Sequence, residues 1–215
     1  MNTRSDRPRR LLHISASPRG ERSESLALAA TFLDAYAEAN DGAQIHHWDL
    51  WDGTLPEFGP DAAAAKMAVF AGEQPVGGAA NAWARARAAF ERFAGYDEYL
   101  FSVPMWNAGV PYIVKQFIDV VSQPGMAFGF DPIEGYTGLL GGRQAAVIYT
   151  SAVYGPGDRA GFGSDFQRPF FDDWLRWVGI EDITEVAFRP NLVTADAATD
   201  RLAAHAAARD AGKLF

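Results

Sequence analysis

Residues 11–25 read LLHISASPRGERSES, and this stretch indicates both the fold class and the position of a binding site. Its first part, 11–15, is a short apolar run that ends at a loop of serine, glycine, proline and charged residues. Such a run is typical of a buried strand that enters a loop. The spaced apolar residues that follow predict a helix over about 25–40, with Ser23 or Ser25 as its N-cap.

The alternation of strand and helix continues along the rest of the chain. Apolar runs predict four further strands, at 45–50, 99–103, 144–150 and 183–188. Helical spacing predicts helices at 61–71, 81–94, 111–123, 170–178 and 194–213. Pro111 is expected at the first position of its helix, Gly179 just after the end of another, and Thr194 at an N-cap. Residues 126–140 are expected to form an irregular excursion or a hairpin, and 151–167 a long loop.

Strands that alternate with helices, and that are apolar throughout, predict an α/β fold: a five-stranded parallel sheet with helices on both faces. Sheets of this kind bind ligands at the carboxyl ends of their strands. The 215 residues show no internal repeat and no linker. We therefore expect a flexible N-terminal tail at 1–9 and a single domain at 10–215.

Composition excludes several function classes. The chain has no cysteine, which excludes disulfides, thiolate metal sites, iron–sulfur clusters and a cysteine nucleophile, so redox chemistry would need a cofactor. With 19 basic and 27 acidic side chains the formal charge is −8, which argues against a nucleic-acid partner. No apolar run is long enough to span a membrane, and no signal peptide is recognised. A cytoplasmic protein is expected.

The loop at 15–25 has the donor groups of a phosphate site. It offers serine hydroxyl groups, two arginines and the unpaired N–H groups of a helix N-terminus, where the helix dipole favours an anion. It lacks the lysine of a P-loop and the GxGxxG of a dinucleotide turn, so a monophosphate fits better. The alternative is an ordinary capping segment.

The loop PMWNAGVP at 104–111 has the groups that would hold a heteroaromatic ring. Asn107 begins a turn with exposed amides and adds a side-chain amide, while Met105 and Trp106 add an apolar face. If it stood alone, this loop would be interpreted as a turn with core aromatic residues.

Residues 104–119, PMWNAGVPYIVKQFID, resemble a pattern of flavodoxin-like NAD(P)H:quinone oxidoreductases, roughly P-x-W/Y-N-x-x-x-P-x-x-L/V-K-x-x-I/F-D. The matching residues are Pro104, Trp106, Asn107, Pro111, Lys115 and Asp119. With the segment at 150–180, the chain looks like the FMN-dependent NADH-azoreductase branch, over about 11–188. The resemblance implies a flavodoxin-like three-layer fold with tightly bound FMN, and a ping-pong transfer of hydride from NADH or NADPH to quinones or azo compounds. It also implies a homodimer with its sites at the interface.

The resemblance also implies the site residues. The FMN-binding positions are Ser17, Ser23, Glu24 and Ser25 at the phosphate, Pro104, Met105, Trp106, Asn107 and Ala108 at the ring, and Ser151, Ala152, Val153 and Tyr154 in a third loop. Phe128 and Phe130 fall in a segment that forms the substrate face across the dimer. The family usually has Phe where this chain has Ala108, and often a glycine pair where it has Ala152 and Val153. No catalytic acid or base is expected, because the chemistry belongs to the flavin. Tyr154 is the one candidate proton donor.

Three other functions remain open. A flavodoxin-type electron carrier would hold FMN without a substrate pocket, a flavin reductase would release it, and a flavin-loaded regulatory scaffold would not turn over. The long segments at 126–140 and 151–167 favour an enzyme, because they are suited to enclosing a substrate.

Several conspicuous polar residues are given structural interpretations. His46 and His47 are neighbours on a strand and point to opposite faces, so they are not expected to share a metal. No metal site is predicted. His13 is expected in the core, and Asp172 and Asp173 as surface charges. Lys115 and Asp119 are spaced for an ion pair within a helix.

Overall fold

The computed structural model describes residues 9–153, 161 and 163–215. Its main sheet has five strands in the order β2-β1-β3-β6-β7, and every neighbouring pair is parallel. The strands are β1 (Arg10–Ser15), β2 (Gln44–Asp49), β3 (Glu98–Pro104), β6 (Gln144–Thr150) and β7 (Asp182–Phe188). All five predicted strands and their parallel arrangement are confirmed.

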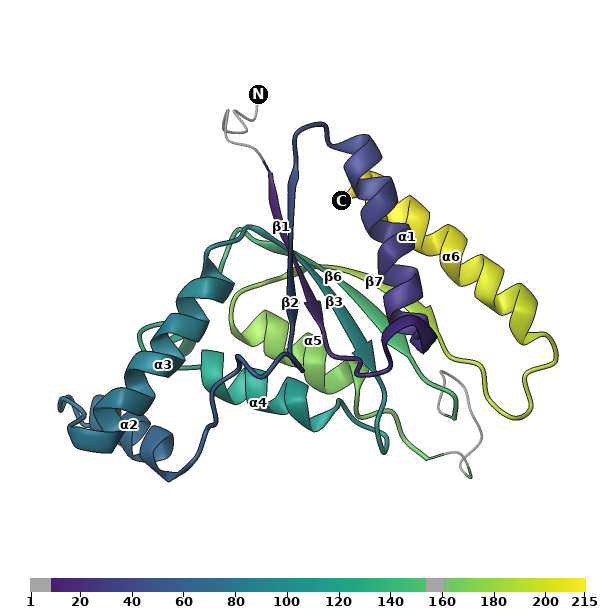
Figure 1. Ribbon diagram of the computed structural model, residues 1–215. Coiled ribbons are helices and arrows are strands. Elements are labelled where there is room, and N and C mark those ends of the chain that lie inside the picture. The colour runs from purple at the N-terminus through teal and green to yellow at the C-terminus, as the bar shows by residue number, and fades with distance from the viewer. Residues whose placement is uncertain (1–8, 154–160, 162) are drawn as a thin grey trace.

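Helices cover both faces of this sheet, as Figure 1 shows. One face carries α1 (Glu24–Ala39) and α6 (Ala197–Leu214), and the other carries α3 (Gly77–Ala94), α4 (Tyr112–Val121) and α5 (Arg168–Trp177). A short 3-10 turn, η1 (Gly20–Arg22), precedes α1, and α2 (Pro60–Phe70) precedes α3. On β1, Leu11 packs in the core cluster beneath α1 and α6, while Leu12 packs in the cluster beneath the other helices. This alternation gives the predicted three-layer fold its two cores.

The predicted excursion at 126–140 contains a small antiparallel hairpin, β4 (Phe128–Asp131) with β5 (Gly135–Gly138). The hairpin docks on the end of α5, where backbone approaches backbone: a Cβ at Gly138 would lie 2.3 Å from the nitrogen of Gly179. Gly179 has φ +99°, and its N–H bonds the Arg176 carbonyl at 2.9 Å. It ends α5 as predicted, because glycine adopts this conformation without strain.

Helix starts and one surface assignment differ from the predictions. Pro111 is the N-cap of α4 rather than its first residue, since its ψ of 147° is extended. The N-cap of α6 is Asp196 and not Thr194, whose hydroxyl instead accepts the N–H of Asn191 in the preceding turn. Asp172 is buried, because it accepts the Tyr149 hydroxyl at 2.5 Å and is paired with an arginine. The sequence pattern cannot reveal such a long-range partner.

The described residues begin at Arg9, the last residue of the predicted tail. Its guanidinium pairs with the buried carboxylate of Glu98 and donates to the carbonyl of Phe215 at 2.6 Å, so it joins β3 to the end of the described chain. Among the described residues, no helix is long and apolar enough to cross a membrane. No group of three potential metal ligands occurs among the residues that the structure describes.

His13 is a satisfied core residue, as predicted. It is buried in β1, with Nε2 2.8 Å from the Ser102 hydroxyl and Nδ1 3.1 Å from Nδ1 of His47. His46 faces the opposite way, and its ring lies 5.3 Å from that of Tyr96. Burial, with a smaller effect of His47, lowers the pKa of His13 to about 4.

This lowered pKa predicts a loss of stability in mild acid. The unfolded chain binds a proton at His13 near pH 6.5 while the folded chain does not, so stability falls as the pH drops from 6.5 towards 4. Between about pH 7 and about pH 5 the loss is about 2 kcal/mol. Urea unfolding at both pH values measures it, and His13→Gln is expected to abolish this part. The exposed His46→Gln is the control; equal pH dependence in all three proteins would contradict the assignment.

Candidate functional site

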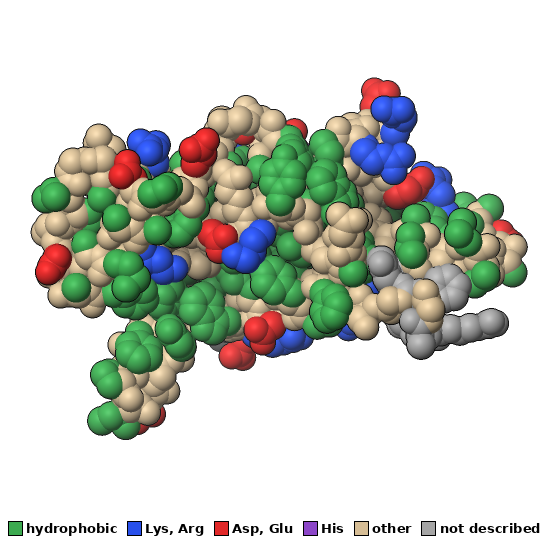
Figure 2. All heavy atoms as spheres, turned by 90° about the horizontal axis from the view of Figure 1, so that it is seen from below, with side chains coloured by type: hydrophobic (Ala, Val, Ile, Leu, Met, Phe, Trp, Pro, Cys, Tyr) green, Lys and Arg blue, Asp and Glu red, His purple; other side chains and the backbone are tan. Residues whose placement is uncertain are grey.

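The predicted site residues lie at the carboxyl ends of the parallel strands, where the loops after β1, β2, β3 and β6 leave the same edge of the sheet (Figure 1). Figure 2 looks onto the lower side of the molecule in Figure 1, towards which these strands run, and hydrophobic side chains gather across the middle of this face. This edge is therefore where a ligand with an apolar ring would be held.

The loop after β1 brings the predicted phosphate residues together. Ser17, Ser23 and Ser25 are all buried, and the hydroxyl groups of Ser23 and Ser25 lie 3.1 Å apart. Ser23 is the N-cap of α1 and accepts the N–H of Leu26 at 3.4 Å. The first N–H groups of the helix, those of Glu24 and Ser25, have no acceptor within the helix. The carboxylate of Glu24 pairs with Arg201 of α6 at 2.7 Å, which leaves its backbone N–H as the group that can face an anion.

The loop after β3 contains a strained turn. The N–H of Trp106 bonds the carbonyl of Gly109 at 2.8 Å, and the reverse bond is 3.0 Å. Between them, Asn107 has φ 48° and Ala108 has φ 70°, and no other non-glycine residue described has a positive φ. A left-handed conformation costs roughly 1–2 kcal/mol at a residue such as alanine. Strain of this kind is concentrated at functional sites.

Some backbone N–H groups of the predicted ring loop are used within the protein and cannot donate to a ligand. The N–H of Met105 donates to Thr150 at 2.7 Å, and that of Trp106 is used within the turn. The N–H groups of Asn107 and Ala108 take no part in these bonds. In the loop after β6, the N–H of Ser151 donates to Phe188 at 3.2 Å. Of the four backbone N–H groups at 105–108, two are therefore left to donate to a ligand.

The remaining predicted positions lie in the loop after β6 and in the hairpin β4–β5. Ala152 and Val153 are exposed, and Tyr154 lies outside the described residues. Phe128 is 2% exposed and packs on Trp177 with ring centroids 4.7 Å apart, so it is a core residue of this chain. Phe130 is 56% exposed. Of the predicted pair, Phe130 alone presents its ring to the surroundings.

An aromatic cluster that the sequence reasoning did not assign to the site joins three of these segments. The ring of Trp51, from the loop after β2, lies 5.7 Å from Trp106 and 5.2 Å from Tyr112 at the start of α4. The indole N–H of Trp51 donates to the carbonyl of Ala16, just after β1, at 3.0 Å. In the sequence, the only indication of this role was that Trp51 directly follows a predicted strand. The cluster fixes the β1, β2 and β3 loops relative to one another.

A polar network that the sequence did not predict supports the strained turn. Gln167 is fully buried; its side-chain amide donates to the carbonyl of Val103 at 2.7 Å and accepts from Arg189 at 3.1 Å. Arg189 also pairs with Asp165. Next to them, the N–H of Phe166 donates to the carbonyl of Ala108 at 2.9 Å. Residues 165–167 thus tie the end of β7 to the end of β3 and to the turn.

The charge state of Asp165 agrees with this role. Burial acts to raise the pKa of its carboxyl, but hydrogen bonds from Arg189 and from the N–H groups of Arg168 and Gln167 outweigh burial and lower it. Asp165 therefore stays ionised at neutral pH and holds Arg189 in place.

Replacement of Gln167 tests the network. Gln167→Leu leaves the Val103 carbonyl and one Arg189 donor buried without their partner, and buried unpaired groups cost about 1–3 kcal/mol each. The free energy of unfolding in urea is expected to fall by about 2–3 kcal/mol. Gln44→Leu, at an exposed position, is the control and is expected to change it by less than about 0.5 kcal/mol. A Gln167→Leu protein as stable as the control would refute the supporting role.

Comparison with known proteins agrees with the fold. The strand order and the polar loops at the carboxyl edge define a flavodoxin-like protein, and a family model described as a flavodoxin-like fold matches residues 9–211. An FMN-dependent NADH:quinone oxidoreductase of Ruegeria pomeroyi is 46% identical over 187 residues, which are 87% of this chain and 92% of the relative. FMN-dependent NADH:quinone oxidoreductase 9 of Burkholderia lata is 36% identical over 96% of this chain and 99% of its own length. The chain belongs to this flavodoxin-like family of FMN-dependent NADH:quinone oxidoreductases.

Solved structures show the same fold. An azoreductase from Bacillus anthracis superposes with a TM-score of 0.86 at 24% identity, over 96% of this chain and 100% of that one. An FMN-dependent NADH-azoreductase from the same organism, solved in complex with FMN, gives a TM-score of 0.84 at 20% identity over 96% of this chain. The resemblance stated from the sequence is confirmed.

Proposed function

We propose that this chain is an FMN-dependent oxidoreductase that transfers a hydride from NADH or NADPH to quinones, azo compounds or both. The relation to FMN-dependent NADH:quinone oxidoreductases over nearly the whole chain carries this proposal, at 46% identity over 87% of its length. The chain keeps the donor groups that such a cofactor needs at the carboxyl edge of its sheet.

The first of these groups fits the phosphate of FMN. The hydroxyl groups of Ser23 and Ser25 meet at the N-terminus of α1, where the N–H groups of Glu24 and Ser25 lack helical acceptors, and Ser17 is a further buried hydroxyl in the same loop. Hydroxyl and N–H donors at the positive end of a helix dipole suit a phosphate. This set would hold the phosphate without a lysine.

The second group fits the ring. Pro104 and Met105 lead from β3 into the strained turn, whose Asn107 and Ala108 N–H groups remain as donors beside the indole of Trp106. Donors held at fixed positions stabilise negative charge that develops at the edge of a bound ring. When bound, FMN supplies the two-electron hydride chemistry that no side chain of this chain can provide. Trp51 and Trp106 exclude water from the side of the turn.

The remaining features of the proposal concern assembly and kinetics. The hairpin β4–β5 exposes Phe130, Ile133 and Tyr136 by 56%, 90% and 56%, an apolar surface suited to a second copy of the chain. A homodimer would place Phe130 beside the partner's site as a wall for the acceptor. Donor and acceptor would use the same ring face in turn, in a ping-pong scheme with tightly held FMN. We place the protein in the cytoplasm.

An anaerobic visible spectrum of the purified, desalted protein tests the proposed function. Flavin bands that bleach on addition of NADH and return on addition of a benzoquinone are expected. Steady-state rates are expected to give parallel lines in double-reciprocal plots at varied quinone concentration, as a ping-pong scheme requires.

Other results would point to other functions. Bands that bleach only with a separate reductase would indicate an electron carrier. Flavin lost on gel filtration but reduced in solution would indicate a flavin reductase. A colourless protein that takes up no added FMN would exclude every flavin contact named above.

Ser23→Ala tests the phosphate loop, and a variant that removes the N-cap of another helix is its control. It removes a hydroxyl from the phosphate set and the N-cap of α1, so FMN affinity is expected to fall about tenfold or more and stability by about 1 kcal/mol. Asp196→Ala removes the N-cap of α6 and is expected to cost similar stability with unchanged FMN affinity. Fluorescence titration of FMN and urea unfolding measure the two quantities. Equal FMN affinity in both variants would remove Ser23 from the site.

A further inference from the structure

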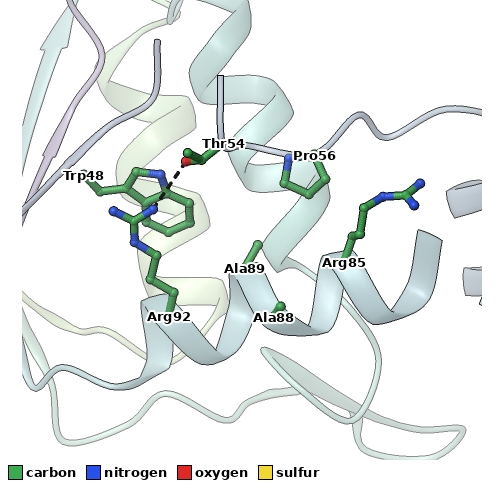
Figure 3. A pocket seen from close by; sticks show the side chains of 7 residues that line it. All are labelled: Trp48, Thr54, Pro56, Arg85, Ala88, Ala89 and Arg92. Atoms are coloured by element: carbon green, nitrogen blue, oxygen red, sulfur yellow. Dashed lines mark hydrogen bonds between the residues drawn. The ribbon is translucent and has the colours of Figure 1, made fainter. Parts of the chain in front are cut away.

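A cavity of about 260 Å³ lies between β2 and α3. Figure 3 shows it from close by, with side chains from β2, from the loop that follows β2 and from one face of α3. It is lined by Trp48, Thr54, Pro56, Arg85, Ala88, Ala89 and Arg92. None of these is a predicted flavin or substrate contact.

The cavity contains a buried donor that has no partner. Trp48 is 1% exposed, and its indole nitrogen makes no hydrogen bond within the described part of the chain. In Figure 3 the indole nitrogen lies on the side of Thr54, within the group of lining residues. An indole can only donate, and a buried donor without an acceptor is unfavourable. The cavity therefore lacks an acceptor atom beside Trp48.

The guanidinium group of Arg92 supplies positive charge beside this donor. Arg92 lies over the Trp48 ring, 4.1 Å from its centroid, and its other contacts are long: 3.4 Å to the Thr54 hydroxyl and 3.3 Å to the His47 carbonyl. Arg85 is two turns earlier on the same face of α3. In the described residues, neither arginine is paired with a carboxylate. An arginine without a carboxylate partner, beside an unpartnered N–H, makes a site for an anion in a chain of net charge −8, and Arg85 adds positive charge at the other end of the cavity.

The walls indicate what kind of anion fits. Pro56, Ala88 and Ala89 are apolar, and the volume is below the roughly 300–1,000 Å³ of sites for drug-sized ligands. A carboxylate accepts two bonds from a guanidinium and one from an indole, while an apolar body covers the alanines. We propose that this cavity binds a small aromatic monocarboxylate, with its carboxylate at Trp48 and Arg92 and its ring against Pro56 and Ala89. This inference does not depend on the proposed oxidoreductase function.

The test follows the tryptophan indole N–H signals of the FMN-saturated protein by nitrogen-15 NMR while benzoate is added. Trp48→Phe assigns the Trp48 signal and removes its donor while it keeps an aromatic ring under Arg92. Benzoate is expected to shift the Trp48 signal saturably. Arg92→Gln is expected to weaken binding about tenfold or more. Arg87→Gln, at an exposed position of the same helix that does not line the cavity, is expected to leave it within twofold.

Several outcomes would overturn the proposal. Benzamide that binds as tightly as benzoate would show that charge is not recognised. Inorganic phosphate that binds more tightly would show that the apolar walls play no part. An unmoved Trp48 signal at about 50 mM benzoate, or shifts confined to other tryptophans, would exclude this cavity. Because Arg92 is exposed, its variant tests the site even if Trp48→Phe does not fold.

Discussion

The parallel pairing of β1 with β3 is the constraint on which the site depends. The two strands run in register from Leu11 beside Glu98 to Ser15 beside Ser102, and the Ala16 N–H then bonds the Ser102 carbonyl at 3.1 Å. β1 ends at Ser15 and β3 runs only two residues past Ser102, so the loops that follow the two strands begin at the same edge of the sheet. His13, bonded to Ser102 at 2.8 Å, fixes the same pair from within the core. The donors for a phosphate and for a ring are therefore positioned by one pair of strands.

The strained turn at Asn107 and Ala108 needs support from outside its own loop. Two positive φ values at non-glycine residues persist only where surrounding contacts compensate for them. That compensation comes from residues 165–167: one N–H reaches the carbonyl of Ala108, and Gln167 holds the strand that leads into the turn. The end of the long loop after β6 thus acts on the β3 loop. The proposed ring site therefore depends on two segments about 60 residues apart in the sequence.

The sequence predicted what local patterns determine and missed what distant partners determine. Apolar runs located all five strands. The N-cap of α1 was narrowed to Ser23 or Ser25, of which the structure has Ser23, and Gly179 was placed at the end of its helix, because capping is a local requirement. The buried polar network of Gln167 and Arg189 carries no periodic signal, since its members meet only in the folded chain. The sequence shows that residue 51 is a tryptophan, but it does not show that this ring lies beside Trp106. The prediction that Asp172 is a surface charge was wrong for the same reason, because its partner Tyr149 lies on another element.

The acidic balance of the chain does not conflict with an anionic cofactor. Its formal charge of −8 is spread over the surface, where salt screens charges beyond about 8–10 Å. The proposed phosphate site consists instead of buried hydroxyl groups and helix N–H groups, whose partial charges act at contact distance and in a poorly hydrated place. The carboxylate of Glu24, at the start of α1, is paired with Arg201 at 2.7 Å. Local dipoles, rather than net charge, therefore determine which ligand this edge of the sheet can hold.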